Sequence, residues 1–187
     1  NKYQIGNSSF TDTKAREKQV NFVDYFVAGE GVYVKKSSSA TFTGLKSFCG
    51  QTVAVETGTT EQTDATNASK LCTGGKKVTV LNFSTQTEAN LAVSSGHATY
   101  GFLDSQIADY VVSQHPTLFK SVGSAINVAP YGIATQKNAN GTALAKAIQA
   151  AIKVMIANGT YLAILDHWGV QAGAVGASKI VLNGATS

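Results

Sequence analysis

Residues 52–60, with the sequence TVAVETGTT, decide the fold class of this chain. The stretch begins as a short apolar run of the kind that forms a buried strand, and it then enters a turn around Gly58. A helix is expected to follow from Thr60. A turn between a strand and a helix exposes backbone N–H groups at the helix N-terminus, where an anion or a ligand carboxylate can bind. The stretch therefore predicts an α/β protein and a candidate ligand-binding turn.

Short apolar runs alternate with longer amphipathic segments over the rest of the chain, which is the pattern of an α/β fold. We expect strands at residues 32–35, 52–56, 77–83, 98–103 and 131–135. We expect helices at residues 60–71, 84–94, 105–113, 142–157 and 161–168, with Ser84 as the N-cap of the second.

Composition excludes several classes of protein. The 187 residues are 43% hydrophobic, which is enough for a buried core. Lys and Arg outnumber Asp and Glu by 15 to 11, but they are scattered and form no basic stripe, so we expect no nucleic-acid partner. No window approaches the roughly 18 apolar residues of a membrane span.

The two cysteines, Cys49 and Cys72, allow two interpretations. They form a disulfide in an oxidising compartment, or they are buried free thiols in a cytosolic protein. The disulfide is favoured because both cysteines border polar loops that contain Gly and Lys. A metal site is disfavoured, because the histidines at 97, 115 and 167 are far away in sequence.

A cluster of hydroxyl side chains precedes Arg16 in residues 8–16 (SSFTDTKAR). An arginine fork and short hydroxyl donors together satisfy a carboxylate, so this segment is a candidate carboxylate site. The alternative is that Thr11 or Thr13 caps a helix whose exposed face carries Arg16.

Asp104 follows the apolar run that ends at Leu103 and precedes a predicted helix. The carboxyl end of a strand in an open α/β sheet faces the ligand crevice, so an acid there can meet a cationic group. An N-cap role for Asp104 is the alternative. No local pattern for a catalytic nucleophile or a positioned histidine base is present, so no catalytic residue, cofactor or metal is expected.

Taken in order, these segments resemble the amino-acid-binding family of ABC transporter substrate-binding proteins, which are type II periplasmic binding proteins and family 3 of the bacterial extracellular solute-binding proteins. The resemblance covers about residues 5–169. It is carried by segments that keep the family's order and spacing: 8–16, 20–26, 45–60, 101–104, 131–137 and 159–169.

The resemblance implies a two-lobed fold in which each lobe is a mixed sheet flanked by helices. Residues 1–24 and 132–187 would form an incomplete lobe one, which lacks the N-terminal part usual in the family. Residues 31–128 would form lobe two. Residues 25–30 and 129–131 would be hinges.

The same resemblance assigns roles to individual residues. Arg16 would bind the α-carboxylate of an amino acid, with Ser9 and Thr11 as supporting donors and Thr60 as a donor from the other lobe. Asp104 would pair with the α-ammonium. Glu56 would contact the ligand side chain, which favours a polar or basic amino acid. A disulfide between Cys49 and Cys72 would stabilise lobe two.

The implied function is capture of a free amino acid outside the cytoplasm, in the periplasm or anchored by lipid at the outer face of the cell membrane. The ligand would be delivered to an ABC importer permease, and the complete protein would be a monomer and not an enzyme. The alternatives are a dehydratase- or lyase-like enzyme on the same fold and the ligand-sensing domain of a receptor.

Overall fold

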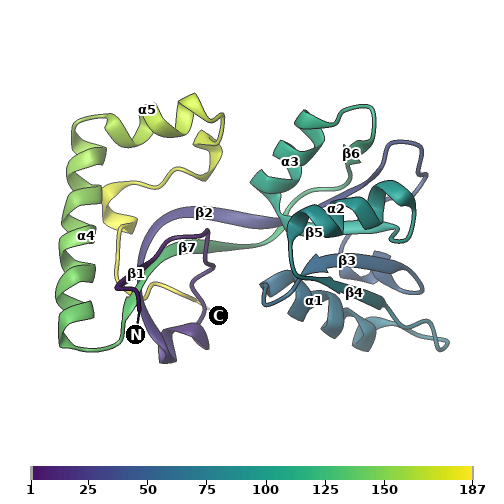
Figure 1. Ribbon diagram of the computed structural model, residues 1–187, viewed down its shortest axis with the longest axis horizontal. Helices are drawn as coiled ribbons and strands as arrows, with labels where there is room; N and C mark the ends of the chain where they lie inside the picture. Colours follow the sequence, from purple (N-terminus) through teal and green to yellow (C-terminus); the bar gives the residue numbers. More distant parts are fainter. Residues whose placement is uncertain (1, 187) are drawn as a thin grey trace. The chain divides into compact units, whose positions relative to one another are not determined.

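The computed structural model describes residues 2–186, and its internal contacts divide them into two compact units. Unit 1 holds residues 2–28 and 128–186, and unit 2 holds residues 29–127. Two strands, β2 (Val20–Lys35) and β7 (Ile126–Gln136), belong in part to each unit (Figure 1). The expected hinge residues, 25–30 and 129–131, therefore lie inside continuous strands.

Unit 2 is built on a mixed sheet with the strand order β2-β5-β3-β4, and β6 pairs with β2 off this path. The new strands are β3 (Thr52–Glu56), β4 (Thr79–Phe83), β5 (Tyr100–Asp104) and β6 (Phe119–Ser121). β3 runs parallel to both of its neighbours, while β5 runs antiparallel to β2. Because β3 and β5 are parallel, their last residues, Glu56 and Asp104, lie at the same edge of the sheet.

Helices cover both faces of the unit 2 sheet: α1 (Thr60–Ala68), α2 (Gln86–Ser95) and α3 (Ser105–Gln114). Alternate residues of β3 enter two different cores, as the pleat of a strand requires. Val53 and Val55 join the core that contains Ala65 of α1. Ala54 joins the core that contains Ala89 of α2 and Ala108 of α3.

The first turn of α2 corrects one detail of the sequence analysis. The N-cap is Thr85 and not Ser84. The Thr85 hydroxyl accepts from the Glu88 N–H at 3.3 Å, and Glu88 Oε2 accepts from the Thr85 N–H at 3.1 Å. The Ser84 hydroxyl donates to the same carboxylate at 2.7 Å. Thr85 takes the cap because only that position is matched by a glutamate three residues later.

Unit 1 contains β1 (Ile5–Gly6), which is antiparallel to β7, and β7 lies beside β2 in the strand order. Two helices, α4 (Ala139–Ala157) and α5 (Thr160–His167), follow β7 in the chain (Figure 1). Val23 of β2 and Ile152 of α4 share a core with Ile180 from the C-terminal segment. That segment runs along β2, where Val23 forms a bridge with Leu182.

All ten expected strands and helices are present, and the ends of all except 52–56 are shifted. Within residues 2–186 the sequence analysis missed β1, β6 and five short 3-10 helices. Those helices are Arg16–Lys18, Leu45–Phe48, Ser69–Leu71, Gln171–Gly173 and Ala177–Lys179. The largest difference is that β2 begins at Val20 and not at residue 32. No single helix within residues 2–186 is long and apolar enough to cross a membrane, although α4 and α5 reach that length and composition as a pair bent by 80°.

Candidate functional site

Arg16 is held in place by the loop that precedes it. It opens a 3-10 helix, and its backbone N–H donates to the Thr13 hydroxyl at 3.2 Å. Its guanidinium Nη1 donates to the Thr11 carbonyl oxygen at 3.0 Å. Thr11 thus anchors the guanidinium group through its backbone carbonyl. The 3-10 helix has Ala15 at its N-cap and no side-chain capping hydrogen bond, so neither Thr11 nor Thr13 caps it and the capping alternative is wrong.

The loop that carries Ser9 and Thr11 is fixed along β7. The Gly132 N–H donates to the Phe10 carbonyl and the Asp12 N–H donates to the Pro130 carbonyl, both at 2.8 Å. Ser9 adopts a φ of 51°, in the left-handed region that few side chains occupy. The structure thus brings Ser9, Thr11 and Arg16 together in one anchored loop of unit 1.

The other three candidate residues lie at the edge of the unit 2 sheet where β3 and β5 end. Glu56 ends β3, and Thr60 is the first residue of α1. The two are linked through Thr59, whose hydroxyl accepts from the Gln62 N–H at 3.1 Å and donates to the Glu56 carbonyl at 2.8 Å. Asp104 ends β5 and occupies the N-cap position of α3, but its side chain makes no capping hydrogen bond. The prediction that the Asp104 side chain caps α3 is therefore wrong.

Glu61 is a buried acid at this edge that sequence reasoning missed. It is 3% exposed, and its Oε2 atom accepts from the Thr60 hydroxyl at 3.2 Å. Burial, followed by the neighbouring charge of Asp104, raises the pKa of Glu61 to about 7. In the sequence, Glu61 could have been identified as a site residue by its position just after the Gly58 turn, in the first turn of a helix.

Glu30 adds a second missed acid to the same edge. It pairs with Asp104 in the register of β2 and β5, and it is 4% exposed. The Asn127 amide donates to Glu30 Oε2 at 2.8 Å and to Asp64 Oδ2 at 2.6 Å. Burial, together with the charges of Asp64 and Glu61, raises the pKa of Glu30 to about 9. In the sequence, Glu30 stands inside the apolar run of residues 26–34, and this position indicated that its side chain would be buried.

The described His, Cys, Asp and Glu side chains form no metal site. No group of three or more His, Cys, Asp or Glu residues within 2–186 is arranged to hold a metal ion. The three histidines are exposed: His97 lies 2.8 Å from the Ser95 hydroxyl, and His115 and His167 contact the rings of Phe119 and Trp168 edge-on.

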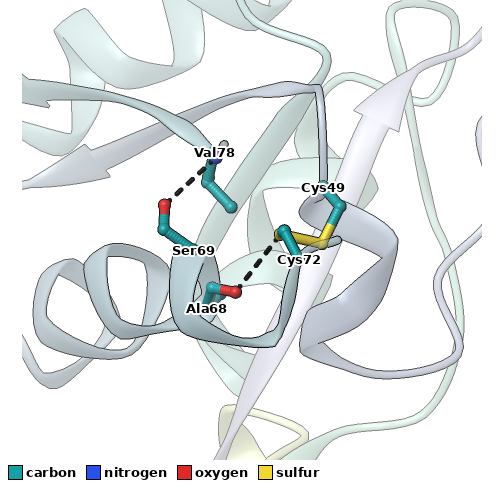
Figure 2. Close-up of a disulfide and its surroundings, with 5 residues drawn as sticks. All are labelled: Cys49, Ala68, Ser69, Cys72 and Val78. Carbon is teal, nitrogen blue, oxygen red and sulfur yellow. Dashed lines mark hydrogen bonds between the residues drawn. A yellow bond between two sulfur atoms is a disulfide. The ribbon is translucent and has the colours of Figure 1, made fainter. Parts of the chain in front are cut away.

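The predicted disulfide between Cys49 and Cys72 is confirmed. Figure 2 shows that it joins the end of the 3-10 helix Leu45–Phe48 to the turn after α1. Cys72 Sγ lies 3.3 Å from the Ala68 carbonyl oxygen, and the Val78 N–H donates to the Ser69 hydroxyl at 3.1 Å. The bond therefore ties together the segments on either side of β3 and α1, which carry Glu56 and Thr60.

A mixed sheet flanked by helices in unit 2, with β2 and β7 continuing into unit 1, is the fold of type II periplasmic binding proteins. The sequence profile of the family described as "Bacterial extracellular solute-binding proteins, family 3" matches residues 1–171. The chain belongs to this family, as the resemblance of its motifs predicted.

Two curated relatives match most of this chain. The arginine-binding protein ArgT of Corynebacterium glutamicum is 28% identical over 172 residues, which are 90% of this chain and 55% of ArgT. The ABC transporter glutamine-binding protein GlnH of Bacillus subtilis is 31% identical over 162 residues, which are 86% of this chain and 56% of GlnH. The chain thus spans about half the length of these relatives.

The structure of an ancestral arginine-binding protein bound to arginine has the same fold. It is 31% identical and superimposes with a TM-score of 0.81, over 89% of this chain and 72% of that protein. The named relatives are binding proteins, and amino acids are the ligands given in their names.

Proposed function

We propose that this chain is the larger part of an extracytoplasmic solute-binding protein that captures a free polar or basic amino acid. The protein would act in the periplasm, or anchored by lipid at the outer face of the membrane, and would deliver its ligand to the permease of an ABC importer. It would work as a monomeric binder and not as an enzyme. Family membership and the names of the relatives support this proposal.

The observation that carries the proposal is the pair of oppositely charged groups fixed on the two units. Arg16 is anchored on unit 1 by the Thr11 carbonyl, and Asp104 ends a buried strand of unit 2. We propose that Arg16 binds the α-carboxylate, with Ser9, Thr11 and Thr60 as further donors, and that Asp104 binds the α-ammonium. An amino acid is a zwitterion, and burying either charge without a partner would cost several kcal/mol.

Ligand choice follows from Glu56 and the acids around it. A carboxylate at the end of β3 could bind the cationic side chain of arginine, lysine or ornithine, or accept from the amide of glutamine. The relatives named for arginine and glutamine support the same two ligand classes. Closure of the two units on the ligand, around residues 25–30 and 129–131, would give the form that the permease recognises.

A thermal-shift screen against the twenty amino acids, ornithine and citrulline tests this function, because a ligand that binds only the folded state raises the melting temperature. We expect a shift with a few polar or basic amino acids, and none with these in Arg16→Ala or Asp104→Ala. Asp109→Asn is the matched control, because Asp109 is an exposed acid on α3, and it should keep the shift. Conversion of an amino acid to a product would instead favour the enzyme alternative.

A further inference from the structure

The 3-10 turn that carries Arg16 is too short to hold its own orientation. It spans Arg16–Lys18, has Ala15 at its N-cap and makes no side-chain capping hydrogen bond. A turn of this length has few hydrogen bonds of its own, so contacts with the rest of the fold have to fix it. Glu17, the middle residue of the turn, supplies two such contacts, one through its side chain and one through its backbone.

The Glu17 side chain is bonded to the C-terminal segment. Its Oε1 atom accepts from the Ala185 N–H at 3.1 Å, and its backbone carbonyl accepts from the Lys137 ammonium group. Lys14 also donates to Oε1 and Oε2 of Glu17, at 3.1 Å each. The Lys14 side chain is 54% exposed, whereas that of Glu17 is only 13% exposed. An ion pair with an exposed lysine contributes little, so the Ala185 N–H is the stronger restraint on the carboxylate.

Ala185 is itself fixed by the residues that lead to it. It is 5% exposed. The Asn183 N–H donates to the Phe22 carbonyl at 3.0 Å, and Asn183 Oδ1 accepts from the Phe22 N–H at 2.7 Å. Gly184 packs so closely on Asp24 that a Cβ at this position would overlap the Asp24 carboxylate. The segment is therefore anchored along β2, and this anchoring holds the Ala185 N–H in place.

We propose that Glu17 is a positioning residue for the carboxylate site, because its bond to the Ala185 N–H fixes the turn that presents the Arg16 guanidinium group to the ligand. The proposal rests on the proposed function, in which Arg16 binds the α-carboxylate. A guanidinium binds a carboxylate through a planar fork, so its orientation has to be held by neighbours that are themselves locked. All three residues belong to unit 1, and Ala185 lies beyond residues 1–171, which the family profile matches.

Two variants of Glu17 separate the hydrogen bond from the charge. Glu17→Ala and Glu17→Gln both remove the negative charge and the ion pair with Lys14. The glutamine amide oxygen can still accept from the Ala185 N–H, whereas alanine offers no acceptor. Glu17→Ala should therefore weaken the binding of the α-carboxylate, and Glu17→Gln should restore it. Lys18→Ala is the control, because Lys18 is an exposed residue of the same turn.

Calorimetry with pairs of ligands measures the effect on the full chain. L-arginine is paired with agmatine and L-glutamine with γ-aminobutyramide, and the second member of each pair lacks the α-carboxylate. In Glu17→Ala we expect the amino acid to bind about fivefold more weakly, and its decarboxylated analogue to bind as it does to the wild type. Glu17→Gln and Lys18→Ala should stay within about twofold of the wild type for both members. Equal weakening of both members in Glu17→Ala, or no recovery in Glu17→Gln, would overturn the proposal.

Nitrogen-15 relaxation of the ligand-free chain separates this proposal from the function on which it rests. The backbone order parameter of Arg16 should be about 0.85 in the wild type and in Glu17→Gln, and it should fall below about 0.6 in Glu17→Ala. Unchanged order in Glu17→Ala would overturn the positioning role. Selective loss of amino-acid binding in Arg16→Ala, with none in Glu17→Ala, would overturn that role alone. If Arg16→Ala weakens both members of a pair equally, or if neither amino acid binds the wild type, the proposed function fails and the positioning role fails with it.

Discussion

Asp12 and Asp24 lie buried against each other in unit 1, with 1% and 4% of their surfaces exposed. Asp12 Oδ1, Asp12 Oδ2 and Asp24 Oδ1 receive no hydrogen bond from the described part of the chain. Burial, followed by the charge of Asp12, raises the pKa of Asp24 to about 7, and burial also raises the pKa of Asp12. The C-terminal segment lies next to this pair, where the Asp24 N–H donates to the Val181 carbonyl at 2.9 Å.

This pair predicts that stability falls as the pH rises. The pKa of Asp24 is higher in the folded chain than in the unfolded chain, so its contribution is complete below about pH 4 and is lost as the pH approaches 7. Asp24→Asn removes that loss. We expect the variant to be more stable than the wild type by about 1–3 kcal/mol at pH 7.5, and not at pH 4. Urea unfolding at both pH values measures the difference, with the exposed Asp166→Asn as the control. An equal effect at both pH values would contradict the raised pKa of Asp24 in the folded chain.

Glu56 is predicted to determine the relative affinities for different amino acids. If its carboxylate meets a cationic side chain, Glu56→Gln should weaken the binding of arginine and lysine by about tenfold or more while changing glutamine binding little. Competition between these amino acids, measured by calorimetry, gives the ranking. Asp109→Asn removes a charge from the same unit and should leave it unchanged. An unaltered ranking in Glu56→Gln would show that Glu56 does not contact the side chain.

The disulfide should stabilise unit 2 locally. It closes a loop with a sequence separation of 23, for which chain entropy gives about 3 kcal/mol. Replacing both Cys49 and Cys72 by Ser should lower the protection of β3 and α1 from hydrogen exchange while α4 in unit 1 keeps its own. Mass spectrometry of the exchanged peptides tests this, and equal losses in both units would contradict a local effect.

Gly101 should tolerate no side chain. A Cβ at this position would overlap the ring of Tyr33, which is fully buried and donates to Asn90 Oδ1 at 2.6 Å. Gly101→Ala should therefore cost about 1–3 kcal/mol of unfolding free energy, measured with urea. The control is Gly176→Ala, where a Cβ meets nothing within 4 Å, and it should change stability by less than about 0.5 kcal/mol. A neutral Gly101→Ala would mean that the Tyr33 ring can move aside.

Periodicity and turn residues predicted the α/β fold well, because each predicted element has a local pattern. The strand 52–56 was placed with its observed ends, and Gly58 marks the turn into α1. β2 was shortened because Asp24 and Glu30 interrupt its apolar pattern, and only tertiary packing buries them. β1 and β6 are only two and three residues long, too short for a pattern to show.

The candidate site was likewise only partly predictable from the sequence. The sequence named Arg16 and Asp104 one at a time, from residue types that suit a carboxylate and an ammonium. It could not reveal that Glu61 is buried beside Asp104, because that proximity depends on the packing of α1 against the end of β5. The roles of these residues as ligand contacts stay predictions.

Arg16 and Asp104 are proposed to bind opposite charges of one amino acid, and calorimetry with altered ligands tests this most directly. Agmatine is arginine without its α-carboxylate. Arg16→Ala should weaken arginine binding by at least about thirtyfold but leave the weaker binding of agmatine unchanged, whereas Asp104→Asn should weaken both. Loss of arginine and agmatine binding to the same degree in Arg16→Ala, or unchanged arginine binding in either variant, would contradict the assignment.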